Sequence, residues 1–272
     1  MTKNNIQKSS IEMLQFDLLR DCCNISHFVT TRNGGVGKGN YATFNLGAYC
    51  GDNPQVVIEN RRRLCESLPV STDALLVPHQ IHGIEVAIIG RDFLLLPQEE
   101  RQMRLKDVDA LVTNEPGVCL AVTTADCVPV LLYAPDCKAI GVVHAGWRGT
   151  AASIVCRTIE TMVKKFACDP ASLLACVGPS ISLEAFEVGE EVADVFRSRG
   201  EGEVVCYLDA SKKPHIDLWE ANRKQLLQCG LADEHIEISG LCTYSRPDLF
   251  FSARRDGLHS GRMLTGIMIN EL

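Results

Sequence analysis

The sequence predicts an α+β fold in a single domain over residues 1–272. Three observations support this prediction. Short apolar runs broken by turn residues fill the middle of the chain, which is typical of buried strands. Longer stretches carry apolar residues at three- and four-residue spacing, which is typical of amphipathic helices. These runs do not alternate in the regular strand–helix order of a parallel α/β protein.

The first half of the chain is expected to hold most of the strands. A glycine-rich loop covers 31–40, and Pro54 suits the first turn of a helix near 54–68. The apolar runs that follow predict strands at 74–77 and 84–89, on either side of the turn PHQIHG, and at 109–112, 118–124, 128–133 and 139–144.

The pattern changes after His144. Apolar residues between Ala152 and Phe166 recur at helical spacing, and Thr150 is the expected N-cap of this helix. The remaining patterns predict a strand at 173–178, helices over 189–200 and 216–230, and a hairpin with a glycine-containing loop over 250–269.

Composition excludes several classes of protein. The net charge of -7 argues against a nucleic-acid partner, because a nucleic-acid binder must neutralise phosphates. No apolar stretch reaches the roughly 20 residues that span a bilayer, and the N-terminus lacks the apolar core of a secretory signal. The thirteen cysteines include no CxxC pair, so we expect reduced thiols in a cytoplasmic protein.

Cys127 and His144 each stand at the end of an apolar run, and His82 lies in the PHQIHG turn. Two histidines and a cysteine thiolate suit zinc, and three protein ligands leave a fourth position open for catalysis. Buried structural residues and a Cys–His nucleophile pair are the alternatives that spacing leaves open. Asp109 and Asp126 are candidates to support such ligands.

Two glycine-containing segments suggest anion binding. In HAGWRGT, Arg148 precedes a helix whose first N–H groups would suit phosphate or a carboxylate, although a capped turn with a solvated arginine has the same pattern. GGVGKGN does not fit a P-loop, because Arg32 stands where the first glycine is required and Gly39 where Ser or Thr would bind magnesium. A lid or a turn is the expected role of that segment.

The whole set of motifs resembles a known family. In order, the motifs are TTRNGGVGKGNYATFNLG, PHQIHG, DALVT, TTADCVPVLL, HAGWRGT, GPSIS with FEVGEEV, and CTYSRPDLFFSARRDG. They are similar to those of the laccase-domain family, whose bacterial members are called YfiH, YlmD or peptidoglycan editing factor. One departure is GVGKGN, where the family more often has a serine after the valine.

The resemblance implies a metal site at His82, Cys127 and His144, which would be both the ligands and the catalytic residues. Zinc is the expected metal, with copper as an alternative because copper binds such ligands tightly. The resemblance places Asn45 and Arg61 near the substrate, and Arg148 would help to hold phosphate. It also implies mixed sheets packed together with helices outside.

The activities implied are those of a purine nucleoside phosphorylase. They comprise phosphorolysis of adenosine, inosine, guanosine and S-methyl-5'-thioadenosine, together with adenosine deamination. An amidase that edits wrongly made muramyl-peptide precursors and a copper-dependent polyphenol oxidase are the alternative functions. Seven histidines with no His-x-His pair argue against a multi-copper mechanism.

Overall fold

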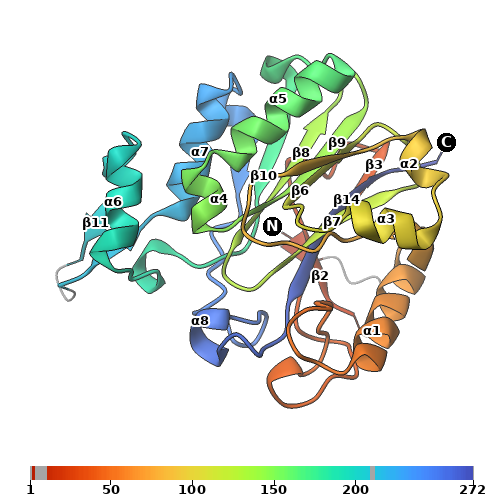
Figure 1. Cartoon of the computed structure of the whole chain (residues 1–272), viewed down its shortest axis with the longest axis horizontal. Helices are drawn as coiled ribbons and strands as arrows, with labels where there is room; N and C mark the ends of the chain where they lie inside the picture. Colours follow the sequence, from red (N-terminus) through yellow and green to blue (C-terminus); the bar gives the residue numbers. More distant parts are fainter. Residues whose placement is uncertain (1, 4–10, 209–211, 272) are drawn as a thin grey trace.

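The computed structural model describes residues 2–3, 11–208 and 212–271, and its strands form two six-stranded sheets and one small two-stranded sheet (Figure 1). The first sheet has the order β1 (Thr2–Lys3), β2 (Met13–Gln15), β3 (Ile25–Thr30), β14 (Met263–Ile269), β7 (Cys119–Thr124) and β4 (Leu75–Leu76). The second has the order β13 (Ile236–Ile238), β10 (Leu174–Val177), β8 (Val128–Ala134), β9 (Ala139–Ala145), β6 (Ala110–Thr113) and β5 (Val86–Ile89). β11 (Val205–Tyr207) pairs with β12 (Pro214–Ile216).

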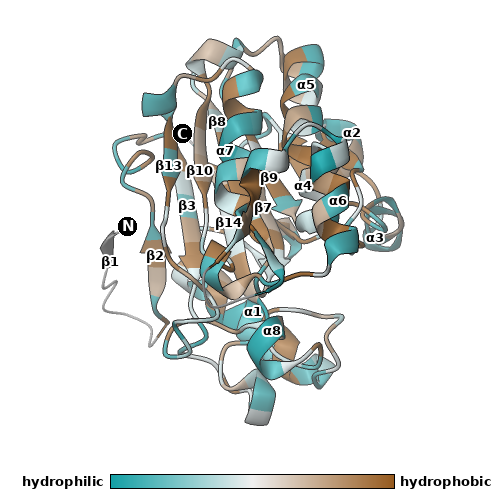
Figure 2. Cartoon of the chain, turned by 90° about the vertical axis from the view of Figure 1, so that its left-hand side faces the viewer, coloured by the Kyte–Doolittle hydropathy of each residue, from teal (hydrophilic) through white to brown (hydrophobic). Residues whose placement is uncertain are grey.

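The two large sheets pack against each other. Buried side chains of β7 and β14, such as Leu120 and Ile267, share one apolar cluster with Leu131 of β8 and Ile140 of β9. In Figure 2 these central strands are largely hydrophobic, whereas the helices carry many hydrophilic residues. Every residue of β8 and β9 is buried, as expected for strands covered on both faces.

Helices cover the outer faces of the sheets (Figure 1). α5 (Ile154–Phe166) packs on the second sheet through Ile159 and Met162, and α7 (Leu218–Gln228) joins the same core. α1 (Pro54–Ser67) places Leu64 in a separate core with residues of the first sheet, and Asn53 caps its N-terminus. The other α-helices are α2 (Arg91–Leu94), α3 (Gln98–Arg104), α4 (Trp147–Ala151), α6 (Glu190–Ser198) and α8 (Ala253–Asp256). In the part of the chain described here, no helix has the length and apolar character needed to cross a membrane.

The α+β fold is confirmed, as are the strands expected in the middle of the chain. Two local predictions are wrong. Thr150 is not an N-cap, because it lies inside α4, which begins after Gly146 and is separated from α5 by the left-handed residue Ser153. The tail does not form a hairpin, because β14 inserts between β3 and β7 and pairs with both.

Candidate metal centre and substrate pocket

The structure brings His82, Cys127 and His144 together. Cys127 directly precedes β8 and His144 lies near the end of β9, and the antiparallel register pairs Val128 with Ala145. His82 comes from the loop that joins β4 to β5. The three ligand atoms all lie within 4.8 Å of one another. The two imidazole rings meet edge to face, with their centroids 4.9 Å apart.

Asp109 fixes both histidines from a fully buried position. Its Oδ1 atom lies 2.7 Å from Nδ1 of His144, which leaves Nε2 of that ring for a ligand. The same carboxylate accepts the backbone N–H groups of His82 at 3.0 Å and Gly83 at 2.7 Å. These bonds hold the loop in place although His82 has a left-handed backbone, with φ 63°. One carboxylate therefore positions two of the three candidate ligands.

Gly146 leaves the space that the three side chains occupy. A Cβ atom at this position would lie 2.9 Å from Cδ2 of His82 and 3.1 Å from Sγ of Cys127. Gln80 ties the same loop to β7, because its Nε2 donates to the Thr123 carbonyl and its Oε1 accepts the Thr123 N–H, both at 2.8 Å. The loop that carries His82 is thus held at both sides of that residue.

Charges inside the site favour the ligand form of the cysteine. Burial disfavours the Cys127 thiolate, but the charge of His144 and hydrogen bonds from His144 and His82 outweigh burial and lower the pKa of Cys127 to about 6. Burial also disfavours protonated His144, but the Cys127 thiolate and Asp109 raise the pKa of His144 to about 9. A metal that binds here therefore meets a thiolate and displaces a proton from His144.

A pocket of about 440 Å³ opens above this group. Three arginines line it, namely Arg61 of α1, Arg254 of α8 and Arg262 just before β14. Tyr49, Trp147 and Phe186 add aromatic side chains to its walls. The pocket thus combines a candidate metal centre, positive charge and aromatic surface.

Backbone carbonyl groups hold the three guanidinium groups. Arg61 donates to the Leu46 carbonyl at 2.9 and 3.0 Å, and Arg254 donates to the Glu187 carbonyl at 2.9 Å. Arg262 donates to carbonyl groups of its own loop at 2.7 to 3.0 Å. Carbonyl acceptors orient a guanidinium without cancelling its charge, so the pocket suits an anionic group.

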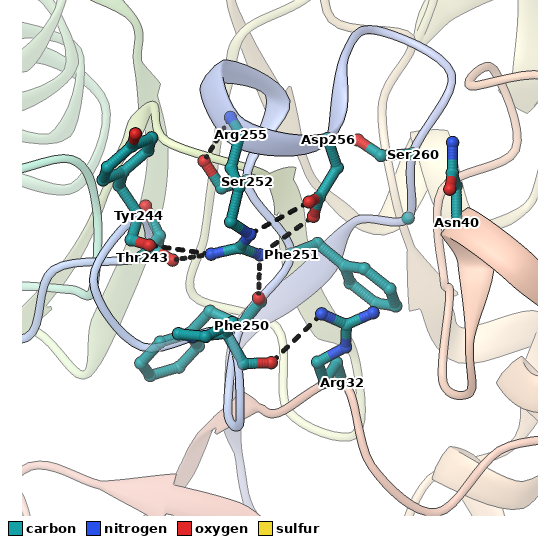
Figure 3. A network of polar contacts seen from close by, with 12 residues as sticks. Arg32, Asn40, Thr243, Tyr244, Phe250, Phe251, Ser252, Arg255, Asp256 and Ser260 are labelled. Atoms are coloured by element: carbon teal, nitrogen blue, oxygen red, sulfur yellow. Dashed lines mark hydrogen bonds and ion pairs between the residues drawn. The ribbon is translucent and has the colours of Figure 1, made fainter. Parts of the chain in front are cut away.

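Arg255 shapes the loop that presents Arg254. Its guanidinium donates to the carbonyls of Thr243, Tyr244 and Phe250 and forms a paired contact with Asp256, with all these distances at 2.8 or 2.9 Å (Figure 3). A planar guanidinium with five donors can satisfy all of these acceptors at once.

Asp126, next to Cys127, anchors this loop from the other side. Its carboxylate accepts the hydroxyl of Thr243 at 2.6 Å, the hydroxyl of Ser252 at 3.0 Å and the N–H of Arg254 at 2.7 Å. Asp126 therefore positions the pocket wall, whereas Asp109 positions the candidate ligands.

Of the predicted substrate residues, Arg61 lines the pocket, but Asn45 and Arg148 are not among its lining residues. Asn45 is fully buried, and its Oδ1 accepts the N–H groups of Gly47 and Arg262 at 3.0 and 2.9 Å. It therefore holds two pocket loops together. Arg148 is exposed and stacks 4.2 Å above the ring of Trp147.

Sequence reasoning did not single out Arg254, Arg262 or Gln80. Arg254 stands in the motif CTYSRPDLFFSARRDG that carries the family resemblance, and this was the available signal. Arg262 and Gln80 gain their positions only through contacts with distant segments, at Asn45 and Thr123.

The chain thus has the features of a metalloenzyme. Two packed mixed sheets hold a candidate Cys-His₂ ligand group, and this group lies beneath a pocket lined by arginines. Residues 26–270 match the family described as multi-copper polyphenol oxidoreductase laccase, and the chain belongs to this family.

Several named relatives and solved structures are similar over nearly the whole chain. The chain is 47% identical to a purine nucleoside phosphorylase of Bacteroides thetaiotaomicron, over 95% of this chain and 97% of the relative. It is 38% identical to adenosine deaminase RL5 from an unknown prokaryotic organism, over 94% and 98%. The crystal structure of YlmD from Geobacillus stearothermophilus superposes with a TM-score of 0.86 at 31% identity, covering 97% of this chain and 98% of that one.

Proposed function

We propose that this protein is a cytoplasmic, zinc-dependent enzyme of purine nucleosides. Its reactions are phosphorolysis of adenosine, inosine, guanosine and S-methyl-5'-thioadenosine, and deamination of adenosine. The observation that carries the proposal is the opening of the His82, Cys127 and His144 group into a pocket lined by three arginines. Relatives named purine nucleoside phosphorylase and adenosine deaminase support the same substrate class.

The residues present fit a zinc ion. Two imidazoles and a thiolate are a catalytic zinc set, Asp109 supports one imidazole, and the glycine at 146 keeps the space clear. Zinc, when bound, supplies a Lewis acid to a substrate oxygen. Within residues 2–3, 11–208 and 212–271, His82, Cys127 and His144 form the one group of His, Cys, Asp or Glu side chains that could hold a metal ion. One such group favours a single metal ion over a multi-copper centre.

The chain's own residues bind and orient the substrates. Arg61, Arg254 and Arg262 hold phosphate, because guanidinium groups match phosphate oxygens in charge and geometry. Trp147 and Phe186 offer aromatic faces for a purine base. Arg148 stacks on Trp147, which lines the pocket, and its charge attracts phosphate. A pocket of this size lies within the usual range of about 300–1,000 Å³ for small-molecule sites.

Product analysis tests this function. Zinc-loaded protein is expected to release hypoxanthine from inosine only when phosphate is present, and to convert adenosine to inosine without phosphate. Turnover of a muramyl-peptide precursor alone would indicate the editing amidase, and oxygen uptake with phenols by copper-loaded protein would indicate the oxidase. Arg61→Gln should raise the KM for phosphate about tenfold, whereas Arg62→Gln, on the same helix but paired with Glu59, should not.

A further inference from the structure

Two cysteines outside the site meet where the β8–β9 turn lies against the end of α5. Cys137 lies in the turn between β8 and β9, and Cys168 follows the end of α5. Both are free thiols, and their Sγ atoms lie 2.9 Å apart. The two side chains therefore point at each other.

Neighbouring contacts hold the two segments in this arrangement. The carboxylate of Asp136 accepts the N–H of Asp169 at 2.9 Å, directly beside the two thiols. Ala167 has a left-handed backbone, with φ 58°, which turns the chain back toward the sheet at the end of α5. The two cysteines are therefore brought together by the fold, independently of any bond between them.

The two thiols differ in accessibility. Cys137 is partly exposed between the exposed residues Asp136 and Lys138, whereas Cys168 is only 3% exposed. Burial, together with a hydrogen bond and the charge of Cys137, raises the pKa of the Cys168 thiol. A reagent in solution therefore reaches Cys137 first, and Cys168 stands behind it as the partner.

We propose that Cys137 and Cys168 form an oxidisable dithiol that closes to a disulfide when the protein meets a peroxide. The sulfur of Cys137 takes one oxygen of hydrogen peroxide to become a sulfenic acid, and the other oxygen leaves as water. The sulfur of Cys168 then attacks that sulfenic sulfur, the S–S bond forms, and the hydroxyl group leaves with the Cys168 proton as a second water. Both thiols are oxidised and the peroxide is reduced.

This bond would tie α5 to the sheet without touching the candidate metal centre. The register of the hairpin places Ala134 opposite Ala139 at the turn with Cys137, and Val128 opposite Ala145 at the other end beside Cys127. The expected effect is therefore on stability and not on turnover.

Peptide mapping tests the proposal on zinc-loaded full-length protein treated with stoichiometric hydrogen peroxide. We expect a linked peptide pair containing Cys137 and Cys168, loss of alkylation at both residues, and reversal by dithiothreitol. The Tm should rise by about 5 °C, because a loop of about 30 residues is closed in the unfolded chain. Nucleoside turnover should stay unchanged.

Single substitutions supply the controls. Cys137→Ser should abolish both the linked peptides and the rise in Tm, whereas Cys23→Ser, at an exposed cysteine, should keep both. The proposal is overturned if Cys137 and Cys168 both remain open to alkylation after oxidation. It is also overturned if Cys137 proceeds to the sulfinic acid. A second pair of interacting thiols, Cys156 of α5 and Cys229 at the end of α7, gives a further check, because a link between these two while Cys137 and Cys168 stay reduced would overturn the proposal.

Discussion

Two buried histidines in the two large sheets have opposite acid–base properties. His27 of β3 is 4% exposed and His144 of β9 is 3% exposed. Burial lowers the pKa of His27 to about 4, and its Nε2 accepts the N–H of Phe16 at 2.9 Å, which only an unprotonated nitrogen can do. Burial acts on His144 in the same direction, but the Cys127 thiolate and Asp109 reverse its effect.

The difference shows that charged partners decide whether burial keeps a titratable side chain neutral. Burial keeps His27 neutral, because no acidic partner among the described residues offsets it, so His27 supports the fold. Two acidic partners make His144 part of a charged site. The cysteines repeat the contrast, because burial raises the pKa of Cys65 to about 11, whereas the two histidines keep that of Cys127 low. A buried group with compensating charges is a candidate for function.

The largest expected effect comes from removing the thiolate that His144 faces. Cys127→Ala leaves two imidazoles, so zinc affinity and inosine phosphorolysis should both fall by about 100-fold or more. Metal analysis and product assays on folded variant and parent would measure this. Lost activity with full zinc occupancy would instead make Cys127 a nucleophile, and activity near that of the parent would make it a structural residue.

The next effect concerns the carboxylate on the other side of His144. Asp109→Asn keeps the size of the side chain but presents an NH₂ group to donors, so the orientation of His82 and His144 is weakened. We expect a loss of about 10- to 100-fold in zinc affinity, measured with a competing chelator. Asp107→Asn, beside the partly exposed His79, is the matched control. Equal affinities in the two variants would contradict the positioning role of Asp109.

A smaller effect should follow from crowding the ligands without removing any. In Gly146→Ala the new methyl group meets His82 and Cys127, so we expect about a tenfold loss of zinc affinity with little change in fold. Gly90→Ala is the control, because nothing lies within 4 Å of its added Cβ. Circular dichroism would check both folds. Unchanged affinity in Gly146→Ala would show that the ligands do not converge as described.

The sequence predicted the helices and strands better than it predicted which strands pair with each other. β8 and β9 were predictable because continuous apolar runs of strand length bury both faces. The tail was assigned to a hairpin because local pattern cannot show that β14 pairs with β3, more than 200 positions earlier in the chain.

The same limit applies to the site. His82, Cys127 and His144 could be named from their places at turns and strand ends and from the family resemblance. Arg262 could not, because its position in the pocket depends on a hydrogen bond to the buried Asn45. Local patterns report which faces are buried, whereas pockets are made by long-range contacts.

The smallest expected effect is a loss of stability when His27 becomes protonated at low pH. Because the pKa of His27 is about 4 in the folded chain and about 6.5 when unfolded, the unfolded chain binds more protons between these values. His27 therefore contributes stability above about pH 6.5, and this contribution is lost as pH falls toward about 4. Between about pH 7 and about pH 5.5 the loss should be about 1 kcal/mol of unfolding free energy.

Comparison with His27→Gln separates this loss from the titration of other groups. The Gln side chain reaches the position of Nε2 and can still accept the Phe16 N–H, but it has no proton to gain. Urea unfolding at the two pH values should therefore show a fall in stability that is about 1 kcal/mol smaller in the variant than in the parent. If parent and variant lose the same unfolding free energy between the two pH values, protonation of His27 does not oppose folding. The contrast between a neutral His27 and a charged His144 would then be wrong.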